Sequence, residues 1–133
     1  MLDPTLEAPT ATEAEVMAAA RALGTALKAS KEFSELVAAD EAITLDAEAT
    51  AAITALNSLQ QELRAEISMG VLDDAQRAEL ERRQQAMTAV PSISAYLEAM
   101  AAFQAVCRDT ASIVSAQIGI DFAANSRSSG CCG

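Results

Sequence analysis

The chain has 133 residues, of which 9 are basic, 19 are acidic and none is histidine, so its formal net charge is −10 at pH 7. The length favours a single domain, and a hydrophobic content of 51% excludes a disordered acidic tail. The lack of histidine excludes Ser-His-Asp triads and imidazole metal ligands, and the negative charge argues against direct binding of nucleic acid. With 5 glycines, 3 prolines and 3% aromatic residues, the composition favours helices that pack closely through alanine.

The first segment, residues 1–11, contains two prolines and is predicted to be an entry segment rather than a helix. It has no basic residue and no apolar core of the kind that a secretory signal needs. No stretch of the chain approaches the roughly 18–20 apolar residues that span a membrane. We therefore expect a cytoplasmic protein.

Two helices are predicted next. Thr12 and Glu15 form a capping box at the start of the first. Gly24 lies inside this helix and predicts a close helix contact or a bend, because glycine costs about 1 kcal/mol relative to alanine there. Ser30 is the expected N-cap of a second, short helix that runs to about residue 42. The apolar stripe of the first helix consists of Val16, Ala20, Leu23 and Leu27.

The third and fourth helices are predicted to form an antiparallel hairpin. Asp46 caps a helix that continues to Gly70, which is expected to be its left-handed terminal residue. Asp73 or Asp74 then starts the fourth helix. A connection of two or three residues leaves two helices side by side and antiparallel.

The last helix is predicted to follow a break at Pro91, with Ser92 as its N-cap. Its apolar face is wider than one neighbouring helix covers, which predicts burial on two sides, either inside the bundle or across an oligomer interface. The fold class is therefore all-α, an antiparallel bundle of four to five helices in residues 12–122. We expect the partner or oligomer interface to include Ile93, Tyr96, Leu97, Met100, Phe103 and Val114.

Residues 123–133 are predicted to form a flexible, Ser-rich tail that ends in two adjacent cysteines, Cys131 and Cys132. Adjacent thiolates lack the two-residue spacer that folds a Cys-x-x-Cys motif around one metal ion. Each could still contribute to a soft-metal or iron–sulfur site that another chain completes. The alternatives are an incidental reactive tail or an intermolecular disulfide. Cys107, inside the last helix, is expected to be a small buried apolar residue.

No set of residues in the sequence predicts catalysis. The acidic pairs at 40–41, 46–48 and 73–74 fall at helix ends or polar faces, where capping and solubility account for them. The basic pair Arg82-Arg83 lies among glutamates, which predicts a salt-bridged surface. There is no glycine-rich phosphate loop and no Glu-x-x-His motif, so we expect a protein that is not an enzyme.

Several different short motifs follow one another in a characteristic order over about residues 12–122. They are Leu23-Gly24, Ser30-x-Glu32-Phe33, Asp46-x-Glu48-Ala49, Leu59-Gln60, Val90-Pro91-x-Ile93-x-x-Tyr96-x-x-Ala99 and the isoleucine-rich run from Ile113 to Ile118. In this order and spacing the chain resembles the YlbF/YmcA family of small bacterial helical regulators. Its end, from Gly130 to Gly133, is similar to the cysteine-containing tails of some members.

This resemblance implies a non-enzymatic adaptor that forms helical dimers or tetramers. The implied assembly is a homo-oligomer, or a hetero-complex with paralogous family members and a YaaT-like protein. It implies a role in competence, sporulation and biofilm formation, and in messenger RNA processing through ribonuclease Y. It also implies a 4Fe–4S cluster held by cysteines, to which Cys131 and Cys132 correspond, with Cys107 as a weaker candidate. Since two adjacent cysteines are fewer than the four ligands of a cluster, such a cluster would be shared between chains.

Overall fold

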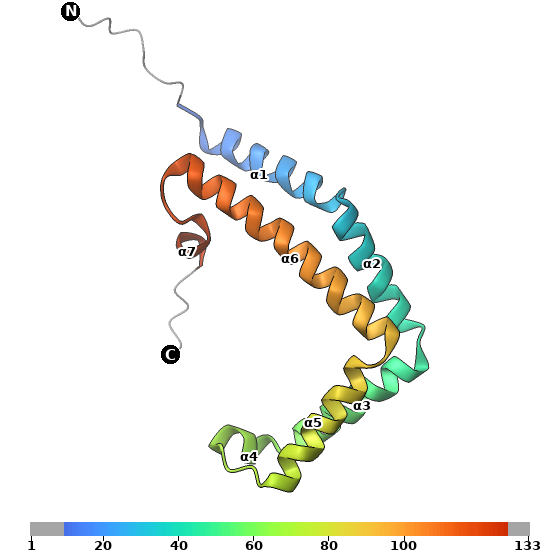
Figure 1. The fold of residues 1–133 in the computed structure, drawn as a ribbon. Helices are drawn as coiled ribbons and strands as arrows, with labels where there is room; N and C mark the ends of the chain where they lie inside the picture. The colour runs from blue at the N-terminus through green and yellow to red at the C-terminus, as the bar shows by residue number, and fades with distance from the viewer. Residues whose placement is uncertain (1–9, 128–133) are drawn as a thin grey trace, which may run out of the picture.

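The structure, a computed structural model, describes residues 10–127. Within that range all regular structure is helical, which confirms the all-α class (Figure 1). Five of the helices are long, in agreement with a bundle of four to five helices, and two more are short. In chain order they are α1 (Glu13–Lys28), α2 (Lys31–Thr44), α3 (Ala47–Glu62), α4 (Arg64–Met69), α5 (Asp74–Thr88), α6 (Pro91–Ile118) and α7 (Phe122–Ser126).

The helices form two arms that meet at a junction (Figure 1). In the long arm α2 packs against α6, and in the hairpin arm α3 packs against α5, with α4 at the free end. The third and fourth predicted helices therefore form the expected hairpin. α1 continues from α2 and contacts it, whereas α7 folds back on the end of α6.

Side-chain caps determine where four of the five long helices begin. Thr12, Ser30, Asp46 and Asp73 each accept a hydrogen bond from a backbone N–H group of the first helical turn, so that of the two predicted caps at 73 and 74 the structure uses Asp73. Of the capping box predicted at Thr12, the structure shows the half in which the Thr12 hydroxyl accepts from the Glu15 amide. At Asp73 the capping box is complete, because the side chain of Gln76 also accepts from the Asp73 amide at 2.9 Å. The caps thus satisfy backbone donors that have no partner inside the helix.

The start of α6 differs from the prediction. Val90 is the N-cap and Pro91 is the first helical residue, so Ser92 lies inside the first turn and is not the cap. The reason is that proline lacks an N–H group and has a helical φ, which makes it well suited to the first helical position. The Ser92 hydroxyl is consequently free to bond elsewhere.

The third predicted helix is also interrupted. It was expected to continue to Gly70, but Leu63 leaves helical geometry (φ −96°, ψ 11°), so that α3 ends at Glu62 and α4 begins at Arg64. Leu63 is buried at this kink, which lets α4 turn across the end of the hairpin arm (Figure 1). Gly70 has φ 69° and ends α4 in the left-handed conformation, as predicted.

Gly24 does not mark a close helix contact. A Cβ atom placed there would meet nothing within 4 Å, and α1 continues through this position without interruption. The expectation of a close approach is therefore wrong for this structure, because α1 has no helix packed on it at Gly24.

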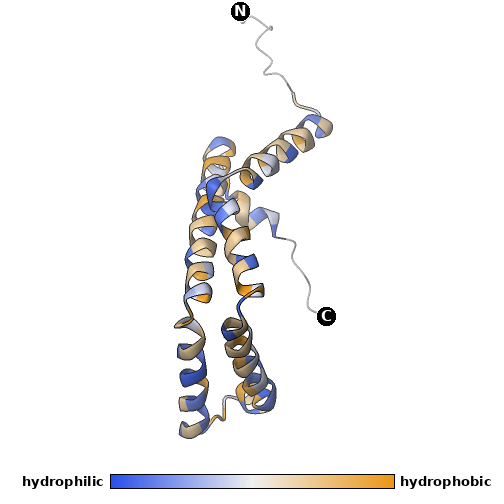
Figure 2. Cartoon of the chain, turned by 90° about the vertical axis from the view of Figure 1, so that its right-hand side faces the viewer, coloured by the Kyte–Doolittle hydropathy of each residue, from blue (hydrophilic) through white to orange (hydrophobic). Residues whose placement is uncertain are grey.

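The buried core of the described residues is small. Six apolar residues are buried, and they lie at the junction and in the hairpin arm: Ala49, Leu56, Leu59, Leu63, Val90 and Ile93. Cys107, expected to be buried, is only half-buried. Many large apolar side chains elsewhere remain exposed. Figure 2 shows hydrophobic segments along the helices of both arms. Among residues 10–127, no helix is both long and apolar enough to cross a membrane.

Candidate interaction site

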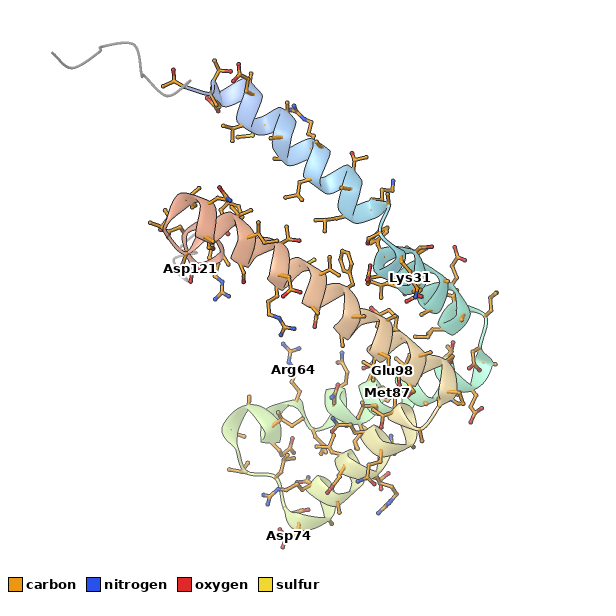
Figure 3. The ribbon with its side chains drawn as sticks, turned by 45° about the horizontal axis from the view of Figure 1, so that its top comes forward. Lys31, Arg64, Asp74, Met87, Glu98 and Asp121 are labelled. Atoms are coloured by element: carbon orange, nitrogen blue, oxygen red, sulfur yellow. The ribbon has the colours of Figure 1, made fainter. Side chains whose placement is uncertain are left out.

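The junction of the two arms is the best-packed part of the molecule. Ala49 is fully buried there, against Val90 and Ile93. Met87, labelled in Figure 3, packs against the same cluster. Two of the sequence motifs, one around residue 49 and one around residue 93, therefore meet in space. This cluster sets the position of α6 relative to the hairpin arm.

A polar contact closes the junction. Asp46 caps α3 through the amides of Glu48 and Ala49, and its second carboxylate oxygen accepts a 2.6 Å hydrogen bond from the Ser92 hydroxyl. The Ser92 hydrogen bond, followed by the Ala49 amide, holds the pKa of Asp46 below its ordinary value of 3.8. The ionised carboxylate is therefore the form that the junction stabilises.

Arg83 makes a hydrogen bond between the two helices of the hairpin arm. Its guanidinium donates to the backbone carbonyl of Ala55 on α3 at 2.7 Å and to Glu79 at 2.9 Å. Arg82 also pairs with Glu79. The hydrogen bond from Arg83, with the charge of Arg82 beside it, lowers the pKa of Glu79. The predicted salt-bridged surface is confirmed, and Arg83 adds a bond between helices that the sequence did not predict.

In the long arm, α2 covers only the first half of α6. The rings of Phe33 and Phe103 lie 5.4 Å apart at an interplanar angle of 59°, a tilted arrangement that favours the ring quadrupoles. Beyond Phe103 the α6 helix continues for four more turns, past the end at which α2 joins α1 (Figure 1). α2 therefore leaves the second half of α6 uncovered, and α7 folds back on the end of this half.

The six predicted interface positions occupy different environments. Ile93 is buried in the junction, where contacts within the chain explain it. Leu97 is 45% exposed. Tyr96, Met100, Phe103 and Val114 are half-buried. The structure therefore does not place all six residues on one exposed surface. Their spacing in the sequence could not distinguish the buried from the exposed ones, because all six lie on one stripe of the same helix.

Exposed apolar side chains lie instead on three other segments. Val16 (52% exposed) and Leu23 (41%) are on α1, and Ile113 (65%) and Ile118 (52%) are on the second half of α6. At the tip of the hairpin arm the exposed apolar residues are Ile67, Met69 and Val71. The tip was missed, although apolar residues on both sides of the helix-ending Gly70 were a visible signal.

The described residues do not form a metal centre. No group of three or more His, Cys, Asp or Glu side chains that could hold an ion lies within residues 10–127. Cys107 is the one cysteine in that range, so these residues do not fit a 4Fe–4S cluster. Cys131 and Cys132, the predicted ligands, lie outside the described residues.

The hollow at the turn between α6 and α7 has polar groups with structural roles. Asp121, labelled in Figure 3, accepts from the Ala124 amide and caps α7. The Ser115 hydroxyl accepts from the Phe122 amide at 3.0 Å. Arg108 also lines this hollow, which is open to solvent. These contacts hold the end of the fold and supply no nucleophile beside a base.

The described part of the chain is thus a small, helical, acidic scaffold that offers apolar faces instead of a catalytic cluster. Residues 16–119 match the family model described as control of competence regulator ComK, YlbF/YmcA, and the chain belongs to this family. The family is described by its regulation of competence, not by an enzymatic activity. No curated protein and no solved structure matched the chain.

Proposed function

We propose that this protein is a non-enzymatic regulatory adaptor that oligomerises and docks on partner proteins in the cytoplasm. The observation that carries the proposal is the set of exposed apolar faces on α1, α6 and the hairpin tip. Exposed apolar patches on a small protein mark sites of protein contact. Membership of a family of competence regulators supports the same reading.

The proposed partners are paralogous family members, a YaaT-like protein and, through them, ribonuclease Y. The regulated processes would be messenger RNA processing, and with it competence, sporulation and biofilm formation. The net charge of −10 supports an indirect route to RNA, since direct binding of a phosphate backbone usually requires a basic surface. The adaptor would therefore act on the nuclease and not on the transcript.

Affinity purification of the tagged chain from its native host, followed by mass spectrometry, tests this proposal. The expected result is stoichiometric recovery of paralogues or a YaaT-like protein. Deletion of the gene should also change the cleavage pattern of transcripts that ribonuclease Y processes. Recovery of the free chain alone under mild conditions, with unchanged transcript ends in the deletion strain, would contradict the proposal.

A second candidate function is a metal or redox sensor. It rests on the adjacent Cys131 and Cys132, which could each give a thiolate to a site shared between chains. Anaerobic purification followed by iron, sulfide and zinc analysis tests it. The expected result is bound metal that is lost in a Cys131→Ser/Cys132→Ser variant and kept in a Cys107→Ser control. Equal metal content in all three proteins would contradict it.

A further inference from the structure

The hairpin tip, residues 66–72, carries apolar side chains that the fold does not use. Ile67 is 42%, Met69 67% and Val71 60% exposed, although all three lie within five consecutive positions. Polar residues would form the same turn, because exposed turn positions usually hold polar side chains. Figure 1 places this tip at the free end of the hairpin arm, away from the long arm. Its apolar side chains therefore await cover from another molecule.

The backbone of the hairpin tip is held in one conformation. The amides of Gly70 and Val71 both donate to the Glu66 carbonyl, the second at 3.0 Å. The Leu72 carbonyl accepts from the Arg77 guanidinium at 3.0 Å, and the complete capping box of α5 follows directly. A surface fixed in this way loses little conformational freedom on binding, which favours its use as a docking site.

Acidic side chains lie on both sides of the apolar ones. Arg77 is already paired with Asp74 at 3.8 Å. In Figure 3, Arg64 points toward the long arm, whereas Asp74 points in the opposite direction. Among the residues that the structure describes, no salt bridge involves the other acidic side chains here. These are Glu62, Glu66 and Asp73. The end of the hairpin arm is thus an apolar surface beside unpaired negative charge.

From these relationships we propose that the hairpin tip binds a basic amphipathic helix of another protein. The apolar stripe of that helix covers the three exposed apolar side chains, and its Lys or Arg side chains pair with the acidic groups beside them. Recognition of an amphipathic helix through its apolar face is a common mode of protein association. The inference rests on the proposed adaptor function and deepens it by naming the docking surface and the chemistry of the partner.

Charge disfavours two other occupants. None of the seven helices in residues 10–127 contains more basic than acidic side chains, so a second copy of the chain has no basic helix to offer from this range. Anionic lipid surfaces attract basic segments, and the acidic groups of the hairpin tip would be repelled by them. A basic helix of a different protein satisfies both the apolar and the charged part of the site.

Titration of the full chain with a helical peptide of leucine and lysine tests the proposal, with binding measured by calorimetry. A second peptide, with glutamate in place of lysine, has the same apolar stripe and the opposite charge. We expect the lysine peptide to bind at least about tenfold more tightly than the glutamate peptide, because only its charges complement the site.

Two triple variants separate the hairpin tip from other apolar surface. The control removes three side chains near the end of α6 whose exposures of 52–65% are similar to the 42–67% at the tip. We expect the Kd of the lysine peptide to rise at least about tenfold in the tip variant and to change less than about twofold in the control. The tip variant is Ile67→Ser/Met69→Ser/Val71→Ser, and the control is Ile113→Ser/Ile118→Ser/Ile120→Ser.

A charge variant tests the acidic part of the site. Glu62→Gln/Glu66→Gln should raise the Kd of the lysine peptide about threefold or more at low salt, and less at high salt, because exposed charges are screened. Glu13→Gln/Glu15→Gln changes the net charge equally on α1 and should have little effect. Circular dichroism checks folding of every variant. If the triple tip variant does not fold, Val71→Ser alone, which lies outside every helix, replaces it.

Several results would overturn the proposal. One is a Kd of the lysine peptide above about 1 mM, and another is equal weakening by the tip variant and its α6 control. Equal affinity for the lysine and glutamate peptides would also refute it. Vesicles of phosphatidylcholine and phosphatidylglycerol provide the last test, since binding to them that is lost in the tip variant would assign the tip to a membrane surface.

Purification of the tagged chain and its tip variant from the native host distinguishes this inference from the adaptor function. We expect partner proteins to be recovered with the wild-type chain and lost with the tip variant. Equal recovery with both chains would refute the docking role of the tip and leave the adaptor function standing. Recovery of no partner with either chain would contradict the adaptor function, whereas the peptide titrations decide the chemistry of the tip on their own.

Discussion

The hydroxyl of Ser92 donates a 2.6 Å hydrogen bond to the carboxylate of Asp46, although the two residues lie 46 positions apart. The bond joins the N-cap of α3 to the first turn of α6 and so connects the two arms of the molecule. Asp46 also accepts hydrogen bonds from two backbone amides at the start of α3. One carboxylate therefore caps α3 and positions α6.

Replacing Ser92 with alanine should lower the free energy of unfolding by about 1–2 kcal/mol, because it removes a hydrogen bond to a charged acceptor. Urea denaturation followed by circular dichroism measures the change. Ser94→Ala is the matched control, since Ser94 is half-buried on the same turn of α6 and no side-chain hydrogen bond is found for it. An equal loss in both variants would show that the contact with Asp46 is not responsible.

Stability should fall in acid through Asp46. Its pKa is lowered in the folded protein, so its contribution is complete above the ordinary value of the unfolded chain and is lost as the pH falls through the lower folded value. Thermal unfolding between pH 2.5 and 6 should show a wild-type advantage over Asp46→Asn that shrinks toward the acid end. Glu79, whose pKa is also lowered, leaves part of the acid sensitivity in the variant. A gap that is independent of pH would contradict this linkage.

Enlarging Ala49 should disturb the junction. Ala49 is fully buried between α3 and α6, and added methylenes in a filled site usually cost about 1–3 kcal/mol. We therefore expect Ala49→Leu to reduce the free energy of unfolding by this amount in chemical denaturation. Ala51→Leu, at an exposed site on the same helix, should leave it nearly unchanged. If Ala49→Leu left the free energy of unfolding unchanged, the two arms could move apart at the junction without loss of stability, which would contradict the prediction.

The Phe33–Phe103 pair should couple α2 to α6. Both rings are half-buried, so Phe103→Ala should cost about 2–3 kcal/mol, less than the loss of a fully buried ring. A double-mutant cycle with Phe33→Ala should give a coupling energy of about 0.5–1.5 kcal/mol. Leu45→Ala, at a site 87% exposed, is the control with almost no expected change. Strict additivity of the two phenylalanine variants would contradict the contact.

Much of the helical plan was predictable from local sequence. The sequence predicts the N-caps at Thr12, Ser30 and Asp46 and the left-handed Gly70, and it limits the start of α5 to Asp73 or Asp74. These features depend on groups within four residues of one another, so a short stretch of sequence contains all the information they need. The family assignment also came from short motifs, and the match over residues 16–119 confirms it.

Three predictions about single positions along the helices were wrong. A proline at the first helical position moved the cap from Ser92 to Val90. The kink at Leu63 was not predicted, because the apolar spacing continues without a break through the point where the chain turns. At Gly24 no neighbouring helix is present, which a count of helix-breaking residues could not show.

By itself, the sequence determined the all-α class, most helix starts, the hairpin of α3 and α5 and the membership of the YlbF/YmcA family. The tertiary structure alone decided which apolar stripes are covered. It buried Ile93, left Ile113 and Leu23 open, and brought Ser92 to Asp46. The physical reason is that helix formation follows from interactions over three or four residues, whereas the cover of a helix face depends on a segment far away in the chain, or on another chain.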